Sequence, residues 1–264
     1  MLHRLKRHPF PVVAHFEHCL VLAYMLPRET LTPLLPPGLE LDTFEEFGFV
    51  AIAMVQTKRL RPAFLPDAFG QDFFLTGYRI FARYTTPEGR SLRGLRILRS
   101  DTDKSLMAFS GNLLTHYNYR RAKVTLNVSP ERIEVQIRTP HQEADLHVLA
   151  DLTSMPAPLP AGSPFHDLKE ARRYAGPLPY TFDYERETNS IIRIQGIRHD
   201  WLPVPVRVDV REVTFFDDAR FRGVKPILAN AFYVKNIPYR WERGVRSVLQ
   251  PANVEKRRLV EVEE

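Results

Sequence analysis

Cysteine is almost absent from this chain: Cys19 is the only one among 264 residues. A single cysteine excludes an internal disulfide framework, and no cysteine and histidine cluster has the spacing of a zinc site. The chain also lacks an apolar segment long enough to cross a bilayer, because the apolar run after its basic start is interrupted by His15, Glu17 and His18. We therefore expect a cytoplasmic protein with no metal and no membrane span.

Three catalytic signatures are missing as well. The sequence has no Gly-x-Ser-x-Gly motif, no Walker loop and no Gly-x-Gly-x-x-Gly in a strand-turn-helix setting. These absences argue against a serine hydrolase, an NTPase and a dinucleotide enzyme. We predict that the protein uses no cofactor.

Lysine is scarce, with 8 lysines against 29 arginines and a net charge of +6. A basic chain attracts nucleic acid, anionic membranes or anionic metabolites through its summed field. The arginines are spread from Arg4 to Arg258, whereas nucleic-acid binders concentrate charge on one face. The charge distribution therefore argues against nucleic acid and leaves a small anionic ligand as the expected partner.

The composition, with 44% apolar and 26% charged residues, is that of a folded chain with a sizeable core. We predict a single domain over residues 1–250 and a charged, flexible tail over 251–264. The apolar stretch PILANAFYV (226–234) could support self-association as a homo-oligomer.

Alternation of apolar and polar residues with period two dominates the sequence. It predicts one hairpin from FFLTGYRIFARYT (73–85) into RSLRGLRILRS, and a second from VTLNV (124–128) into IEVQIRT. Helices are few and are expected over 27–35, over 101–114 with Asp101 as the cap, and over 163–175 with Ser163 as the cap. Strands joined by short turns predict a mainly β (α+β) fold, in which an antiparallel sheet closes into a barrel-like structure with a few peripheral helices.

One stretch, THYNYRRAKVTLN (115–127), gathers aromatic and cationic residues ahead of an apolar strand. If the chain is extended from residue 117 to 128, alternation places four polar residues on one face: Tyr117, Tyr119, Arg121 and Lys123. The register of the following hairpin then places Lys123 opposite Arg138. Two directly opposed cations are destabilising unless water or an anion lies between them.

Two interpretations of this cationic face remain open. The face is solvated, where screening weakens the repulsion, or it lines a cavity in which Arg121, Lys123 and Arg138 bind a carboxylate or phosphate. In a cavity, the neighbouring cations would also lower the pKa of Lys123 and make it a candidate Schiff-base nucleophile. His116 is a candidate proton donor beside it.

The first hairpin carries two further arginines. Arg79 interrupts an aromatic strand in phase with Phe73, Leu75 and Phe81, and Arg96 lies on the partner strand. Each is either a cavity-facing anion ligand or an outward arginine whose stem packs on its neighbours. Trp201, near two prolines, is interpreted as a buried residue at a structural corner.

Several longer segments resemble a known family in their type and order. They are LPRETLTPLLPPGLELDTFEEFGFVAIAMV, LTGYRIFARYTTPEGRSLRGLRILRSDTD, THYNYRRAKVTL, EARRYAGPLPYTF and IRHDWLPVPVRVDV, which together cover about residues 15–240. In these segments the chain resembles the acetoacetate decarboxylase-like superfamily, within a bacterial branch known only as a domain of unknown function. The resemblance implies a mainly antiparallel β structure wrapped around a central cavity.

The family's catalytic residues do not carry over to this sequence. In the true decarboxylases, an aromatic-Pro-Lys-Lys segment after the helix supplies the Schiff-base lysine and a neighbour that lowers its pKa. The corresponding place here reads Tyr117-Asn118-Tyr119-Arg120, with no lysine. The glutamate of the preceding hairpin is also missing, since FLTGYRIF offers only Thr76 and Tyr78.

The leading hypothesis is therefore a protein that binds a small anionic organic molecule, a keto acid or similar, in a central β cavity. The candidate ligand-binding residues are Tyr117, Tyr119, Arg121, Arg79, Arg96 and Arg138, and the candidate catalytic residues are Lys123 and His116. One alternative is a Schiff-base lyase, aldolase or dehydratase that uses Lys123, which would be a cofactor-independent lyase acting on a keto acid. A second alternative is a basic interaction protein for nucleic acid or anionic lipid.

Overall fold

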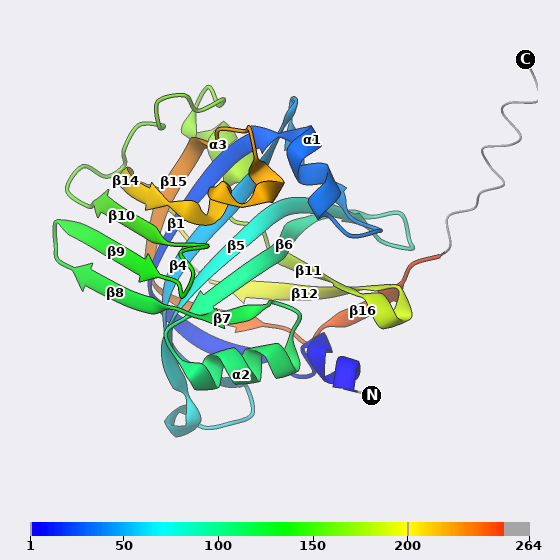
Figure 1. The fold of residues 1–264 in the computed structure, drawn as a ribbon. Coiled ribbons are helices and arrows are strands. Elements are labelled where there is room, and N and C mark those ends of the chain that lie inside the picture. The colour runs from blue at the N-terminus through cyan, green and yellow to red at the C-terminus, as the bar shows by residue number, and fades with distance from the viewer. Residues whose placement is uncertain (1, 200, 251–264) are drawn as a thin grey trace, which may run out of the picture.

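Strands make up most of the computed structural model, which describes residues 2–199 and 201–250 (Figure 1). The larger sheet contains β1 (Val12–Pro27), β2 (Glu40–Leu41), β3 (Thr43–Phe44), β4 (Phe47–Pro62), β5 (Gln71–Thr85), β6 (Ser91–Thr102), β7 (Tyr119–Arg121), β11 (Tyr180–Glu185), β12 (Ser190–Arg198), β13 (Val204–Pro205), β15 (Ile227–Trp241) and β16 (Val245–Val248). The smaller sheet contains β8 (Lys123–Val128), β9 (Arg132–Arg138), β10 (Leu146–Asp151) and β14 (Arg207–Val213). The predicted tail over 251–264 lies outside the described residues.

Short helices lie at the two ends of the larger sheet (Figure 1). The α-helices are α1 (Arg28–Leu31), α2 (Ser105–Leu114) and α3 (Leu168–Ala175). The 3-10 helices are η1 (Leu2–Arg7), η2 (Thr32–Leu34), η3 (Asp67–Phe69), η4 (Arg186–Thr188), η5 (Thr214–Asp217) and η6 (Ala219–Phe221). None of the helices in the described ranges is both long and apolar enough to span a bilayer.

Seven strands of the larger sheet close into a ring in the order β1-β4-β5-β6-β11-β12-β15, because β15 pairs with both β12 and β1. Neighbours in the ring are antiparallel except β6 and β11, which run parallel over three residue pairs. This arrangement confirms the predicted mainly β, barrel-like fold. The predictions of a single domain and of a cytoplasmic location stay predictions.

Both predicted hairpins are present. In the first, β5 pairs with β6 from Leu75 opposite Thr102 to Thr85 opposite Ser91. In the second, β8 pairs with β9, and the predicted register is confirmed because Lys123 lies opposite Arg138. The second hairpin keeps one register throughout, whereas the first has a register shift between Tyr78 and Arg79.

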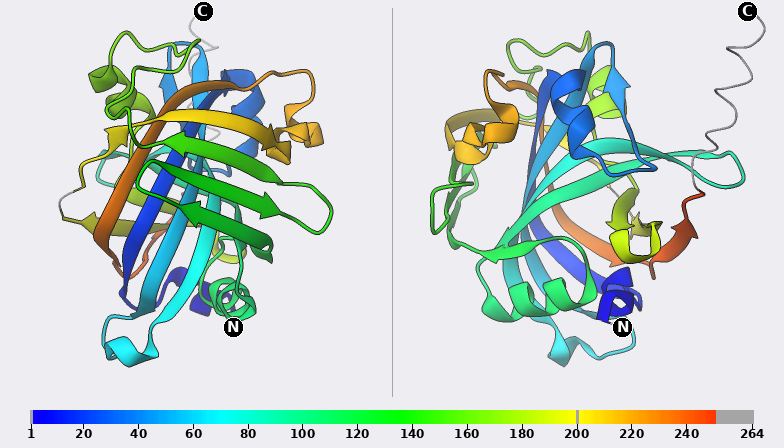
Figure 2. Two further views of the ribbon diagram at one scale, coloured as in Figure 1. Left: turned by 90° about the vertical axis from the view of Figure 1, so that its left-hand side faces the viewer. Right: turned by 45° about the vertical axis from the view of Figure 1, so that its right-hand side comes forward.

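The two faces of the ring strands pack against different partners. One face, which includes Leu22, Ile52 and Tyr78, packs in a common core with Val135 and Val148 of the smaller sheet. Figure 2 shows this smaller sheet laid across the outside of the larger one. The other face lies inside the ring. Strands buried on both faces read as continuous apolar runs, as residues 19–26 of β1 do.

Two helix starts differ from the sequence-based expectation. Asp101 does not cap α2, because it lies in β6 opposite Thr76 and is fully buried. Ser163 does not cap α3 either; the cap is Asp167, whose carboxylate accepts a 2.7 Å hydrogen bond from the Glu170 backbone N–H. Both predictions were wrong because a polar residue near a helix start has several possible hydrogen-bond partners. Asp101 is used in strand pairing, and Asp167, closer to the helix than Ser163, provides the cap.

The segment PILANAFYV is also not a free surface. It forms the start of β15, which pairs with β1 along most of its length, and residues from Ala229 to Val234 are buried within the chain. Its apolar character is therefore explained by the core. The predicted homo-oligomer loses this support and stays a prediction.

The N-terminal segment is held on the ring by one buried ion pair. Arg7 donates from Nε and Nη2 to the two carboxylate oxygens of Glu185, at 2.8 and 2.6 Å. Burial alone would raise the pKa of Glu185, but Arg7 and Thr188 outweigh it and hold that pKa at about 2. This pair fixes the position of residues 8–10, which follow directly.

The Arg7–Glu185 pair predicts a pH-dependent stability. Because the pKa of Glu185 falls from its ordinary 4.5 to about 2 on folding, its contribution is complete above pH 4.5 and is lost as the pH falls toward 2. Glu185→Gln should lower the free energy of unfolding at pH 7 by on the order of 3 kcal/mol, at about 1.36 kcal/mol per pKa unit, and by much less at pH 3. Urea unfolding followed by circular dichroism at both pH values measures this. Glu46→Gln, in an exposed pair with Arg28, is the matched control; equal losses in the two variants would contradict the assignment.

Candidate functional site

The ring encloses a cavity of about 170 Å³. Its wall consists of the inner faces of β1, β4, β5, β6 and β15. Residues 8–10 and the inner side of α2 contribute to the wall, as do residues 176–178 and Trp201. In Figure 1, α2 and the N-terminal segment lie together at one end of the ring.

Small residues explain why the ring is hollow. One line of cross-strand partners on β1, β4, β5 and β6 consists of Val21, Ala53, Gly77 and Ser100. The adjacent line places Ala23 and Ala51 beside Arg79. Side chains normally fill the interior of a ring this small, so a run of small residues across adjacent strands leaves room for one small ligand.

Arg79 is the central charge of this wall. Its guanidinium lies across Gly77, where an added Cβ would come within 2.7 Å of the Arg79 Nε. That Nε is buried and has no hydrogen-bond partner among the described residues. No aspartate or glutamate belongs to the described lining of the cavity. A buried guanidinium nitrogen without a partner is an unsatisfied donor that an anionic ligand would satisfy.

Two tyrosines place hydroxyl groups near Arg79. Tyr117 and Tyr119 line the cavity with their ring centroids 6.3 Å apart, and the buried Tyr117 hydroxyl has no partner in the part of the chain that the structure describes. Burial raises the pKa of both side chains, so both remain protonated hydrogen-bond donors at neutral pH. They therefore suit an acceptor such as a carboxylate or a carbonyl oxygen.

The position of Tyr119 is set by α2. The Asn112 side chain donates to the Tyr119 carbonyl and accepts from the Tyr119 N–H, both at 2.8 Å. The Tyr119 ring lies against Gly111, where an added Cβ would come within 2.4 Å of the ring. Short strand β7 is thus attached to the helix that precedes it.

Arg198 is a second cation in the cavity wall. Its Nη1 donates to the Leu178 carbonyl at 3.2 Å, and its guanidinium carbon lies 4.8 Å from the centre of the Trp201 ring. Burial raises the pKa of the Cys19 thiol to about 12 and lowers the pKa of His8 to about 4. At neutral pH the charge of the described lining therefore comes from Arg79 and Arg198.

The stretch THYNYRRAKVTLN divides between the cavity and the surface. Tyr117 and Tyr119 line the cavity, but the side chains of Arg121 and Lys123 are exposed and do not belong to its described lining. We predicted one continuous strand from residue 117 to 128, and this was wrong. The chain leaves the larger sheet after β7 and enters the smaller sheet at β8, with Ala122 between them. Alternation therefore does not carry the cavity face beyond Tyr119.

The other candidate residues also divide between the cavity lining and positions outside it. Arg79 lines the cavity, whereas Arg96 is paired with the buried Asp183. Arg138 is paired with Glu212 and with Asp145, the latter at 3.1 Å, so the carboxylates beside it supply the anion that its position opposite Lys123 requires. His116 is half-buried outside the described lining, with its Nε2 unpartnered and its pKa lowered by burial.

Sequence reasoning missed several residues of the wall. Arg198 and His8 were not candidates, and Trp201 was expected to be a buried corner residue but is half-buried in the lining. Their place in the wall depends on how the ring closes, which no local pattern reveals. Gly77, two residues before Arg79 on the same strand face, was a signal that could have been read, since a glycine there makes room for a large side chain.

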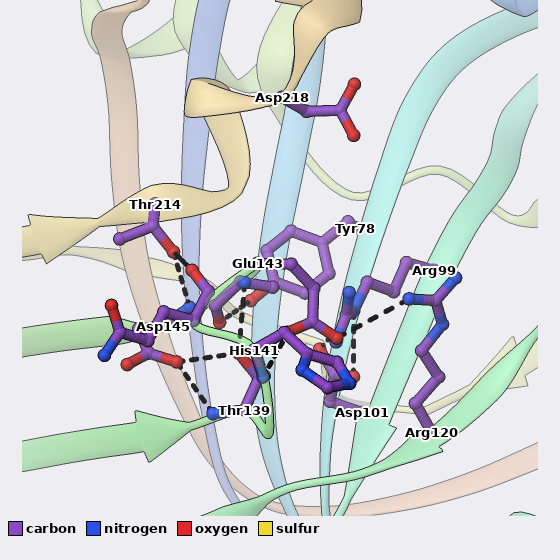
Figure 3. A network of polar contacts seen from close by, with 12 residues as sticks. Tyr78, Arg99, Asp101, Arg120, Thr139, His141, Glu143, Asp145, Thr214 and Asp218 are labelled. Atoms are coloured by element: carbon purple, nitrogen blue, oxygen red, sulfur yellow. Dashed lines mark hydrogen bonds and ion pairs between the residues drawn. The ribbon is translucent and has the colours of Figure 1, made fainter.

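A second polar cluster lies between the two sheets, away from the cavity lining (Figure 3). The Arg99 Nε donates to both carboxylate oxygens of Asp101 at 2.9 Å, and its Nη2 donates to Glu143 at 3.0 Å. Tyr78 donates to the Ala144 carbonyl at 3.0 Å. The charged groups of this cluster are paired with one another, so we assign it to holding the loop 139–145 on the larger sheet.

Solved structures define the class of this fold. The chain is similar to an acetoacetate decarboxylase-like enzyme from Sphingomonas wittichii RW1, with a TM-score of 0.56, 13% identity, and coverage of 90% of this chain and 92% of that one. It is similar to the acetoacetate decarboxylase of Legionella pneumophila, with a TM-score of 0.59, 14% identity, and coverage of 91% and 88%. It is also similar to the enduracididine biosynthesis enzyme MppR, with a TM-score of 0.59, 15% identity, and coverage of 90% and 89%. The protein has the acetoacetate decarboxylase-like fold.

The family follows from the sequence itself. The model of the family DUF2071, described as "Uncharacterized conserved protein", matches residues 13–243. This match covers most of the chain, and the protein therefore belongs to that family. A search of curated proteins finds no match. The resemblance is thus confirmed in two parts: the chain belongs to an uncharacterised conserved family, and its fold is acetoacetate decarboxylase-like.

Proposed function

We propose that this protein binds a small organic anion, a keto acid or a similar carboxylate, in its central cavity. One observation carries the proposal: the Arg79 Nε is buried and unpartnered at a cavity whose described lining contains no acidic residue. Leaving a buried charged donor unpaired costs free energy, which a bound carboxylate would recover. MppR, which has the same fold, has been crystallised with pyruvate, and this supports the choice of ligand class.

Each polar side chain of the cavity wall is given a role in binding the ligand. Arg79 pairs with the carboxylate of the ligand, because a guanidinium fork matches a carboxylate in geometry. Tyr117 and Tyr119 donate hydroxyl groups to the carboxylate or to a keto oxygen. Arg198, held against Trp201, adds positive potential without offering a wholly free guanidinium.

Calorimetric titration tests this function. We expect pyruvate and acetoacetate to bind the wild-type protein with a stoichiometry of one, and acetone, which has the ketone without the carboxylate, to bind at least about tenfold more weakly. Binding of neither acid would sink the proposal. An equal affinity for acetone would remove the role of the charge.

The alternative of a Schiff-base enzyme needs a lysine in the cavity. No lysine belongs to the described lining, and Lys123 is exposed on β8. We therefore expect borohydride treatment in the presence of pyruvate or acetoacetate to leave every lysine unmodified. Peptide mapping by mass spectrometry measures this, and an adduct on Lys123 would instead establish the lyase, aldolase or dehydratase chemistry.

The alternative of a basic interaction protein has a different signature. Contacts to phosphates of nucleic acid or lipid weaken steeply with added salt. A gel-shift titration and a liposome pull-down across a salt series separate it from cavity binding, in which the charged group is shielded from bulk ions. We expect no salt-sensitive binding to either polyanion.

A further inference from the structure

The wall next to Arg79 is largely apolar. Its cross-strand partners are Ala51 on β4 and Ile97 on β6, and Leu75 and Phe81 lie on the same face of β5, while Ser100, opposite Gly77, is a polar residue of the same wall. Beyond the groups that would bind its carboxylate, a ligand would therefore lie mostly against hydrocarbon side chains. Pyruvate, with one methyl group, covers little of such a surface.

An aromatic cluster forms another part of the wall. Phe16 stacks on Tyr239 with ring centroids 4.6 Å apart, and Tyr239 lies 4.5 Å from Trp241. Trp201 meets the Tyr239 ring edge-on at 6.2 Å, and its buried indole Nε1 has no partner within residues 2–199 and 201–250. All four residues line the cavity. Rigid aromatic surfaces favour a planar apolar partner, which can stack or lie edge-on.

The size of the cavity fits the same kind of ligand. An apolar protein cavity of about 150 Å³ holds a benzene molecule. The cavity here measures about 170 Å³, so it has room for a ring of this size. The apolar wall and the Arg79 guanidinium lie in one space.

The hydrogen-bond donors of the wall favour a carboxylate. Arg198 already donates to the Leu178 carbonyl and lies on the face of Trp201, which leaves Arg79 as the guanidinium with an unpartnered buried nitrogen in the described lining. The fork of one guanidinium matches the two oxygens of a carboxylate, whereas a phosphate presents a third oxygen that needs a further donor. We infer that the cavity selects a monocarboxylate that carries an apolar body of about the size of an aromatic ring. This inference rests on the proposed function and narrows its ligand class.

Titration calorimetry with three probes tests the selection: phenylpyruvate, pyruvate and phenyl phosphate. We expect phenylpyruvate to bind about 10- to 100-fold more tightly than pyruvate, because burial of the ring removes apolar surface from water. We expect phenyl phosphate to bind more weakly than phenylpyruvate.

A variant in the wall of the cavity provides a second measurement of the selection. Val12→Phe places a larger side chain opposite Trp241, at the aromatic cluster and far along β1 from the line that holds Arg79. It should weaken phenylpyruvate at least about tenfold while changing pyruvate less than about threefold. Thr125→Leu, at an exposed position on β8, is the matched control and should change neither affinity. The melting temperature of each variant shows whether it folds. If a variant does not fold, the comparison of the three probes on the wild-type protein still tests the selection.

The possible outcomes distinguish a failure of this inference from a failure of the proposed anion binding. Equal affinities for pyruvate and phenylpyruvate would overturn the selection for an apolar body and leave the anion site intact. Tighter binding of phenyl phosphate would overturn the selection for a monocarboxylate. Binding of none of the three probes would overturn the proposed function as well.

Discussion

Arg79→Met is expected to weaken the binding of pyruvate at least about 100-fold. Removing one partner of a buried, hydrogen-bonded charge pair costs about 2–5 kcal/mol, and 100-fold corresponds to about 2.7 kcal/mol. Calorimetric titration of the variant measures the loss. Arg121→Met is the matched control, since Arg121 is exposed on β7, and this variant should bind pyruvate within about twofold of the wild type.

The same substitution is expected to stabilise the ligand-free protein. The Arg79 Nε has no partner among the described residues, so methionine of similar length removes a desolvation cost without breaking a contact. We expect a gain of about 1 kcal/mol, or roughly 2–4 °C in Tm by differential scanning fluorimetry. A large loss of stability would show that Arg79 is needed for the fold, and unchanged pyruvate affinity would remove it from the site.

Gly77→Ala tests the position of the Arg79 charge while keeping the charge itself. The added Cβ would lie 2.7 Å from Nε and 2.9 Å from Nη2, so the guanidinium must move. The atoms in the way are the far end of a flexible side chain, and the fold can therefore accept the change. We expect pyruvate binding to weaken about tenfold with little change in Tm, a combination that a merely structural glycine would not produce.

Arg99→Met is expected to have the largest effect on stability. Arg99 and Asp101 are almost fully buried, and the substitution leaves the Asp101 carboxylate without its partner between the two sheets (Figure 3). Breaking a buried pair from one side costs about 3–5 kcal/mol, which lowers Tm by roughly 10 °C in a chain of this size. Chemical unfolding at pH 7 measures the difference.

Arg120→Met is the control for the Arg99 prediction. Arg120 lies 3.6 Å from the same Glu143, but its side chain is 48% exposed, and exposed ion pairs contribute about 0–1 kcal/mol. We expect a loss of less than 1 kcal/mol. Similar losses in the two variants would mean that the network does not hold the sheets together.

The hairpins and the strand face that Arg79 shares with its neighbours could be predicted because they depend on neighbours in sequence, whereas the side of the sheet on which that face lies was left open. Period-two alternation places Arg79 in phase with Phe73, Leu75 and Phe81, and all four line the cavity. The same reasoning placed Lys123 opposite Arg138, as the structure has it. In each case a short turn or an unbroken strand carries the phase.

The change of sheet after β7 could not be predicted from that pattern. Polar and apolar residues alternate from Arg121 to Val128 without interruption, yet Arg121 pairs with Thr102 in one sheet and Val124 pairs with Ile137 in the other. The break follows from tertiary pairing, which overrides a local pattern. For the same reason Arg198, Trp201 and His8 were missed, since ring closure brings them to the cavity.

A crystal structure of the wild-type protein with phenylpyruvate would test the central claim most directly. We expect the carboxylate oxygens to lie about 2.7–3.2 Å from the Arg79 guanidinium, with the ring inside the cavity between the aromatic cluster and the apolar face of β5. A ligand bound instead at the surface beside Lys123 and Arg138, with the cavity unchanged, would contradict the account.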